Sequence, residues 1–348
     1  MKYLHKFESK YKMDFGYATD YREPWVGVES ENHEITFNDK TAVEDYEGMP
    51  LTMKAISGRG AVYVRWDSPY TIQYSRDGGD NWSALTSATT ITLQDGDEVS
   101  FKGTEDNYVY TRLDEDDDEE DAYSRFRVSC QYGDSLNPNG VDLMGNIMSM
   151  IAGDAYRTTN SVGEEAFRFM FGGSGNRVLS AKHLVLPARN LSSRCYCEMF
   201  SGSILYMPPA VLPATRLYSQ SYNGMFYSTK IKEAPIISAT TLASGCCSSM
   251  FSNCYWLEKG PALMAKTLTS YCYERMFSNC YELRYIKAMF TGSTFSNSEL
   301  RYWTEMCYSA KENGVFVKNS ASNFSTRGSN GIPNQWQIVN EVYPDAIQ

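Results

Sequence analysis

Five copies of the dipeptide Met-Phe stand at nearly constant intervals in this chain, and a sixth, Met289-Phe290, lies outside the period. The copies stand at residues 170–171, 199–200, 225–226, 250–251 and 276–277, so the intervals are 29, 26, 25 and 26 residues. A second motif, such as Leu212-Pro-Ala-Thr-Arg-Leu217, stands between successive copies. Self-similarity at this period, with leucines at fixed offsets, is typical of a leucine-rich solenoid, in which each repeat buries its core only by stacking on its neighbours.

Small residues flank the methionine of each repeat at intervals of four. Cys272, Met276 and Cys280 show the spacing, which predicts that each such set lies on one face of a short helix. Ser203 and Thr229 take the place of the second cysteine in two other repeats, so this position accepts only small side chains. We therefore expect the Met and Phe side chains to fill the interior.

The chain has nine cysteines, most of them inside the repeat frame. Equivalent cysteines on neighbouring helices would lie ~8–10 Å apart, whereas a disulfide needs Cα atoms within ~7 Å. Cys195-Tyr-Cys197 and Cys246-Cys247 have no second pair at zinc-finger spacing and no histidine nearby. We interpret the cysteines as buried free thiols and expect neither a metal nor another cofactor.

The repeat frame resembles the BspA-like leucine-rich repeats of Bacteroidetes surface proteins and of the phages that infect these bacteria. The resemblance is carried by Met-Phe-x-x-Cys-x-x-Leu and Leu-Pro-Ala-Thr-x-Leu, from about Gly145 to Phe290. The segments 314–319 and 331–338 are similar to the closing cap of those proteins, and Glu23-Pro-Trp-Val26 is similar to the N-terminal region of phage-type members. The second full repeat departs from the pattern because it lacks both cysteines.

Residues 49–132 contain short segments in which apolar and polar residues alternate, separated by turn residues, as in a β-sandwich. The expected fold is therefore multidomain and β-rich α+β, with a β-sandwich before a BspA-like leucine-rich-repeat solenoid. Its expected parts are an N-terminal arm (1–48), a β-sandwich (49–133), the solenoid with its N-terminal cap (134–291) and a C-terminal cap (292–348).

Two motifs in the N-terminal half have a functional interpretation and a structural one. Ser75-Arg-Asp-Gly-Gly-Asp-Asn-Trp82 fits the Asp-box of sialidase propellers, but those proteins carry several copies, so we expect a single hairpin turn with Trp82 packed beneath it. The acidic run Asp114–Asp121 lacks the glycine and the alternation of a calcium loop, and is expected to be a solvated loop.

Charge is divided unevenly along the chain. Residues 1–165 hold 15 Lys/Arg and 32 Asp/Glu, whereas residues 166–291 hold 13 Lys/Arg and 5 Asp/Glu. No run approaches the ~18 apolar residues of a membrane helix, and charges at the start of the chain predict that this segment is not a signal peptide. We expect no membrane insertion and no nucleic-acid partner.

The resemblance implies a phage virion structural protein, a fibre or a capsid or tail decoration, that displays its solenoid for attachment to a host surface. Such a protein would assemble in the host cytoplasm and would not be an enzyme. The alternatives are a bacterial BspA-like surface adhesin, located on the cell surface, and, from a different class, a polysaccharide depolymerase, for which no motif was found.

Exposed aromatic rings stack on sugar rings, and nearby cations pair with acidic groups of the same ligand. The residues predicted to bind a glycan or protein on the host surface are Tyr255, Trp256, Tyr281, Lys230, Lys232, Lys259, Arg284 and Lys287. The residues predicted to anchor the arm to other virion proteins are Tyr21, Pro24 and Trp25. The resemblance also implies self-association of sister chains, and phage fibres are commonly trimers. A further candidate partner for the positive charge is the acidic run Asp114–Asp121 of another copy.

Overall fold

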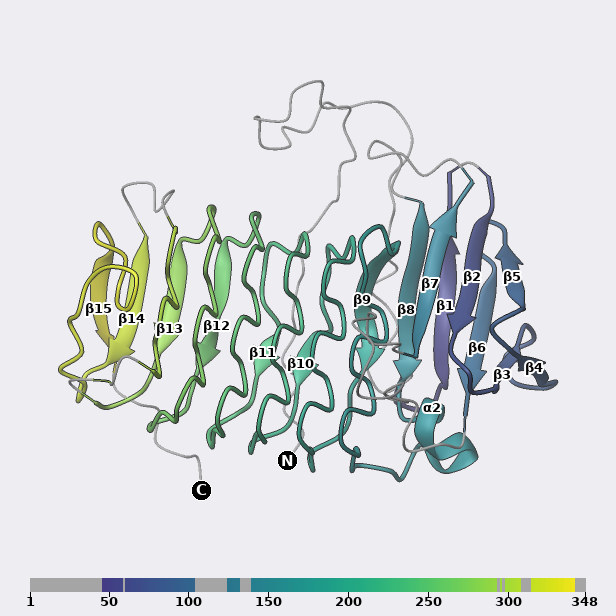
Figure 1. The fold of residues 1–348 in the computed structure, drawn as a ribbon, viewed down its shortest axis with the longest axis horizontal. Helices are drawn as coiled ribbons and strands as arrows, with labels where there is room; N and C mark the ends of the chain where they lie inside the picture. Colours follow the sequence, from purple (N-terminus) through teal and green to yellow (C-terminus); the bar gives the residue numbers. More distant parts are fainter. Residues whose placement is uncertain are drawn as a thin grey trace, which may run out of the picture.

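The computed structural model describes residues 46–58, 60–103, 124–131, 139–292, 295, 298–307 and 314–341. The residues predicted to anchor the arm, Tyr21, Pro24 and Trp25, and the acidic run Asp114–Asp121 lie outside this part of the chain. The molecule is elongated, with the N-terminal strands at one end and stacked turns of chain extending from them (Figure 1).

The structure is rich in strands and has almost no helix, which accounts for only 3%. The strands are β1 (Leu51–Ile56), β2 (Val62–Asp67), β3 (Ile72–Ser75), β4 (Ser83–Leu85), β5 (Thr90–Leu93), β6 (Glu98–Lys102), β7 (Arg125–Cys130), β8 (Gly140–Asn146), β9 (Val178–Val185), β10 (Val211–Leu212), β11 (Ile236–Ile237), β12 (Lys259–Leu263), β13 (Tyr285–Ala288), β14 (Val315–Asn319) and β15 (Gln337–Glu341). The helices are α2 (Ser149–Ala152) and the 3-10 turn η1 (Gly153–Ala155). The helical part of the expected α+β class is therefore wrong for the described residues, which form strands and turns.

The N-terminal strands form two sheets. One has the order β4-β3-β6-β1-β8-β9 and the other the order β5-β2-β7. Strands β2 and β7 alternate in burial, as the sequence predicts, whereas the first three residues of β1 are all buried. Phe101 of β6 and Phe126 of β7 meet between the sheets with ring centroids 4.8 Å apart, so the apolar faces of the two sheets share one core.

The larger sheet runs directly into a β-solenoid. Strand β8 is antiparallel to β1 but parallel to β9, where the stacked turns begin. The solenoid makes about five turns over residues 211–341, and β12, β13, β14 and β15 pair in parallel in that order. Strands β14 and β15, which lie in the segment predicted to be a cap, thus continue the same sheet (Figure 1).

The Met-Phe segments are not helices but ladders of consecutive turns, which together form a surface that we call the turn face. Residues with positive φ recur at every fourth position: in one segment they are Arg194, Glu198 and Gly202. The Phe200 N–H donates to the Met225 carbonyl of the next turn (2.9 Å), whereas the Met199 N–H donates to the Tyr196 carbonyl of its own turn (3.3 Å). The spacing of four is therefore real, but it comes from repeated turns and not from a helix.

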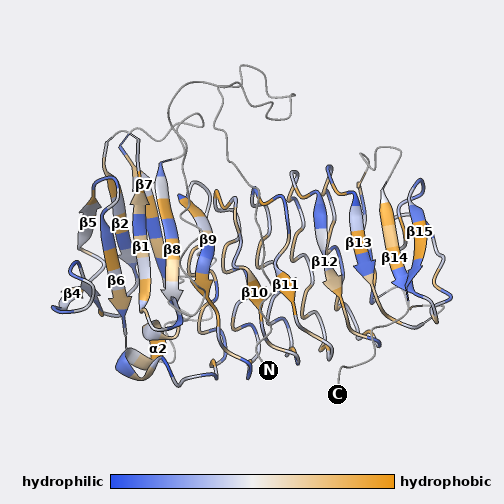
Figure 2. Cartoon of the chain, turned by 180° about the vertical axis from the view of Figure 1, so that it is seen from behind, coloured by the Kyte–Doolittle hydropathy of each residue, from blue (hydrophilic) through white to orange (hydrophobic). Residues whose placement is uncertain are grey.

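The Met and Phe side chains fill the solenoid interior, as predicted. All five Met-Phe pairs are fully buried. The rings of Phe171, Phe200, Phe226, Phe251 and Phe277 form one continuous stack with neighbouring centroids 5.5–5.9 Å apart. Figure 2 shows the alternation of apolar and polar residues along the turns that this stacking requires.

The repeat cysteines are buried, which confirms their role as small interior side chains. All nine cysteines are free thiols, and only Cys130 is partly exposed. The thiols of Cys254 and Cys280 donate to the carbonyl oxygens of Phe226 and Phe251 in the preceding turn, at 2.9 and 3.1 Å. Cys307 makes the same contact one turn later, at 3.1 Å from the Phe277 carbonyl, so it belongs to the repeat frame although the sequence motif does not include it.

Candidate functional site

Tyr255 and Tyr281 form an exposed aromatic pair, which we call the aromatic corner. Their side chains are 45% and 37% exposed, and their rings stack with centroids 5.2 Å apart and planes 10° from parallel. Each tyrosine directly follows a cysteine whose thiol points into the solenoid, so the next side chain along the chain points outward. The structure thus brings together two of the three predicted aromatic residues, and Trp256 lies beside them, half-buried.

Three of the predicted cations lie on the same edge of the solenoid. The Glu258 N–H donates to the Lys232 carbonyl and the Arg284 N–H to the Glu258 carbonyl, both at 2.8 Å, so these residues occupy the same level in successive turns. Lys232 is only loosely paired, with Nζ 4.0 Å from Glu258, and Arg284 lies 3.1 Å from Glu282. Lys259 is exposed and has no ion pair with a described residue. Lys259 therefore offers a cationic group to an incoming ligand, whereas Lys232 and Arg284 would have to exchange their glutamate partners for it.

The other two predicted cations are engaged within the protein. The Lys287 side chain is 19% exposed and its Nζ lies 2.5 Å from a carboxylate oxygen of Glu341. Lys230 is half-buried with its Nζ 5.8 Å from the Tyr206 ring centre, and burial together with the charge of Arg177 lowers its pKa. Both side chains hold parts of this chain together, which leaves them poorly placed for a ligand.

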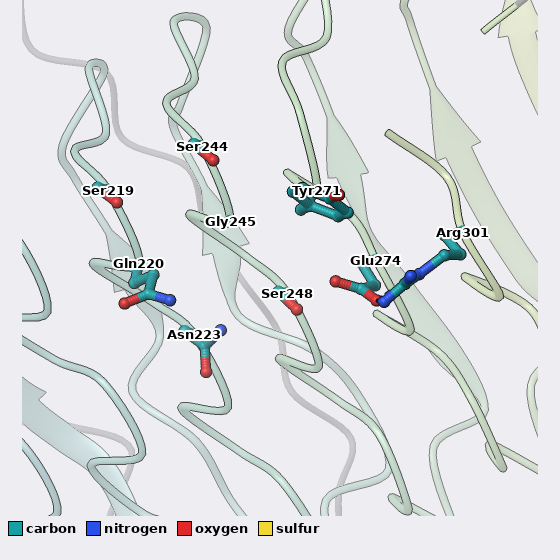
Figure 3. A pocket seen from close by; sticks show the side chains of 9 residues that line it. All are labelled: Ser219, Gln220, Asn223, Ser244, Gly245, Ser248, Tyr271, Glu274 and Arg301. Carbon is teal, nitrogen blue, oxygen red and sulfur yellow. Dashed lines mark hydrogen bonds and ion pairs between the residues drawn. The ribbon is translucent and has the colours of Figure 1, made fainter. Parts of the chain in front are cut away.

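A second feature lies on the turn face and has no counterpart in the sequence predictions. It is a polar hollow of about 270 Å³ that spans four successive turns (Figure 3). We call it the polar hollow, and its lining residues are Ser219, Gln220, Asn223, Ser244, Gly245, Ser248, Tyr271, Glu274 and Arg301. Its only sequence signal is a glycine at a position where other repeats carry Arg194, Gln220 and Tyr271.

The hollow exists because Gly245 has no side chain. Arg194, Gln220, Gly245 and Tyr271 occupy equivalent positions in successive turns and all have positive φ, between 54° and 61°. At Gly245 the row of long side chains is interrupted, and Tyr271, 42% exposed, borders the gap. A missing side chain in an otherwise continuous row is not visible as a motif, which explains why sequence analysis did not find the site.

The Asp-box forms the turn between β3 and β4, as expected for a single hairpin. Asp77 accepts hydrogen bonds from the Ser75 hydroxyl (2.6 Å) and from the backbone and side chain of Asn81 (3.0 and 2.7 Å). These bonds, chiefly that of Ser75, hold the pKa of Asp77 below its usual range. The Trp82 indole N–H closes the turn on the Gly79 carbonyl at 2.9 Å, so these polar groups are used to build the turn.

No three His, Cys, Asp or Glu side chains in the described part of the chain cluster closely enough to hold a metal ion. None of the helices formed by described residues has the length and hydropathy needed to cross a bilayer.

Comparison with known proteins gives no relative: no family model, no curated protein and no solved structure matches this chain.

Proposed function

We propose that the protein is an attachment protein whose solenoid binds an acidic surface polysaccharide along the edge that carries the aromatic corner. The observation that carries the proposal is the stacked, exposed pair Tyr255 and Tyr281. The faces of such exposed aromatic rings suit the C–H faces of sugar rings. Lys232, Lys259 and Arg284 on the same edge supply positive charge for carboxylate or sulfate groups.

The repetition of the solenoid supports a polymeric ligand. Successive turns of a β-structure are ~4.8 Å apart, a distance similar to the length of one sugar unit in an extended polysaccharide. A chain of sugars lying along the solenoid axis would therefore meet equivalent groups at each turn. Many weak contacts of this kind add up without a deep pocket, because the second and later units bind intramolecularly.

The proposal also covers the type of solenoid, the fold of the N-terminal strands and the place of the protein on a virion. The repeat motifs support a BspA-like leucine-rich-repeat solenoid, and the two facing N-terminal sheets support a β-sandwich at its start. The resemblance of the motifs to phage-type members is what supports a place on the virion surface, in an assembly of sister chains. A bacterial surface adhesin would use the same edge, whereas a depolymerase would release oligosaccharides from the bound polymer.

Binding to an array of acidic polysaccharides, measured at low and at physiological salt, tests the proposal. We expect Tyr255→Ala with Tyr281→Ala, and separately Lys232→Glu with Arg284→Glu, to weaken binding at least tenfold. Binding by the unmodified chain should fall as salt rises, because exposed charges are screened over ~8 Å at physiological ionic strength.

Tyr218→Ala is the matched control, because Tyr218 is 43% exposed and has Arg216 5.9 Å from its ring centre, outside the edge described above. Binding that survives both double variants, or that is lost equally with Tyr218→Ala, would contradict the proposal. Release of oligosaccharides during the assay would favour the depolymerase.

A further inference from the structure

We infer that the polar hollow is a separate binding site for a neutral sugar unit. The inference extends the proposed function, and rests on it only in taking a carbohydrate as the ligand. The polar hollow is a different site from the aromatic corner, and it would bind a neutral sugar where the edge with the aromatic corner would bind an acidic one.

The hollow is large enough for one sugar ring. Its volume of about 270 Å³ lies just below the ~300–1,000 Å³ typical of pockets for drug-sized ligands. It is open to the surface of the turn face (Figure 3), so one unit of a longer chain can enter while its neighbours stay outside.

Hydrogen-bond donors lie on one side of the hollow. The Gln220 carbonyl oxygen accepts a hydrogen bond from Arg194 Nε at 2.6 Å, which fixes the amide so that its nitrogen points toward the hollow (Figure 3). The Asn223 amide nitrogen also points in the direction of Ser248 (Figure 3). These two amides present N–H groups that no described residue accepts.

A carboxylate oxygen lies on the opposite side. Glu274 Oε1 accepts from both Nε (2.7 Å) and a terminal nitrogen of Arg301, so Oε2 remains open and points toward Ser248 (Figure 3). Ser219, Ser244 and Ser248 add hydroxyl groups to the lining, and Ser248 lies between Asn223 and Glu274 (Figure 3). A sugar hydroxyl both donates and accepts, so a ring with adjacent hydroxyls can accept from the amides and donate to Glu274.

The charge of the hollow favours a neutral ligand. Glu274 and Arg301 neutralise each other within it, and Arg194, beside Gln220, is paired with Glu165 at 3.1 Å. A charged ligand would lose its hydration in the hollow and would find no unpaired opposite charge there, which costs free energy. The Tyr271 ring, with Arg301 5.5 Å from its centre, supplies the apolar wall against which the sugar face would pack.

The test uses the full chain and a panel of methyl glycosides of glucose, galactose, mannose and N-acetylglucosamine, with glucuronic acid as the charged member. Binding is detected by saturation-transfer NMR at millimolar ligand. We expect at least one neutral glycoside to bind and glucuronic acid to bind at least tenfold more weakly.

Gly245→Asn places a side chain in the hollow at a small backbone cost, since Asn253 and Asn279 already adopt φ of 61° on the same face and Gly245 has the same φ. It should reduce binding at least tenfold. Ser249→Asn is its control, four residues along at φ 54° and outside the lining, and should leave binding unchanged. Tyr271→Ala should also weaken binding, whereas Tyr302→Ala, equally exposed and with Arg275 near its ring, should not.

The inference is overturned if no neutral glycoside binds, or if binding is the same in Gly245→Asn and Ser249→Asn. The aromatic corner is assessed separately with Tyr255→Ala and Tyr281→Ala, which should leave glycoside binding at the hollow intact. Failure of acidic polysaccharides to bind, with neutral glycosides still bound, would therefore remove the proposed edge site and leave the hollow standing.

Discussion

The rings of Phe200 and Phe226 stack with centroids 5.7 Å apart and planes only 3° from parallel. Phe226 stands in the same relation to Phe251 in the next turn, at 5.6 Å and 5°. Each turn of the solenoid therefore places the same side chain at the same point, and the interior is built from interlocking neighbours. In such a structure stability is approximately the sum of the turns and of the interfaces between them.

Phe226→Ala should remove two interfaces at once and lower the free energy of unfolding by ~3–5 kcal/mol. The measurement is urea unfolding followed by circular dichroism. Tyr218→Ala, at an exposed position, should change the free energy by no more than ~0.5 kcal/mol. A loss below ~1 kcal/mol in Phe226→Ala would mean that the stack contributes little.

Buried thiols should make the protein sensitive to alkali. Burial raises the pKa of Cys195, Cys197, Cys272 and Cys307 to about 12 from an ordinary value of 9.0. Above pH 9 the unfolded chain loses these protons while the folded chain keeps them, so the stabilisation present below pH 9 is lost between pH 9 and pH 12. The free energy of unfolding should fall by more than ~2 kcal/mol between pH 9 and pH 11.

The same burial predicts thiol reactivity. At pH 8 an aromatic disulfide reagent should modify at most Cys130 in the folded protein and all nine thiols after unfolding. Rapid modification of several thiols in the folded protein, or a free energy of unfolding that stays constant to pH 11, would show that the repeat cysteines are accessible.

The sequence was sufficient to predict a repeating structure with the Met and Phe side chains inside, because the counterparts of Met276 and Phe277 are buried in all five repeats. It did not predict how far the repeating structure extends, since β14 and β15 lie in the segment predicted to be a cap and continue the same sheet. It could not distinguish a helix from a ladder of turns, since both place residues such as Cys272 and Cys280 at intervals of four. The distinction depends on hydrogen bonds to the next turn, which lie about 26 residues away along the chain.

The candidate site was predicted in part for the same reason. Tyr255 and Tyr281 follow inward-pointing cysteines, so their exposure could be inferred from the repeat alone. Lys287 could not be judged, because its partner Glu341 stands 54 residues later in a segment without the repeat motif. Gly245 could not be identified as the origin of the polar hollow, because the site depends on side chains from four turns.

The variant Lys287→Met tests whether Lys287 stabilises the fold or binds the ligand. Lys287 of β13 reaches Glu341 of β15 across the intervening strand β14. We expect this variant to increase hydrogen exchange in β15 and to leave polysaccharide binding within twofold of the unmodified chain. Lys232→Met is the control on the exposed edge, and it should weaken polysaccharide binding without changing hydrogen exchange in β15. If binding is weaker in Lys287→Met but not in Lys232→Met, the Lys287 side chain contacts the ligand.

Asn176 joins the N-terminal sheets to the first turn of the solenoid. Its amide nitrogen donates to the carbonyl oxygens of Phe126 (2.7 Å) and Phe171 (3.0 Å), and its oxygen accepts from the Val128 N–H at 3.0 Å. The side chain is buried, so Asn176→Ala would leave these backbone groups without partners and without water. A single unsatisfied buried group costs ~1–3 kcal/mol.

We therefore expect Asn176→Ala to lower the free energy of unfolding by at least ~2 kcal/mol and to weaken the coupling between β7 and the solenoid. Hydrogen exchange at the Val128 amide should accelerate more than exchange at Met276 N–H, which lies far along the solenoid and bonds within its own turn. Asn190→Ala, at an exposed position, is the control and should change neither. If Asn176→Ala accelerates exchange equally at both amides, the two parts unfold as a single unit and Asn176 is not a separable joint between them.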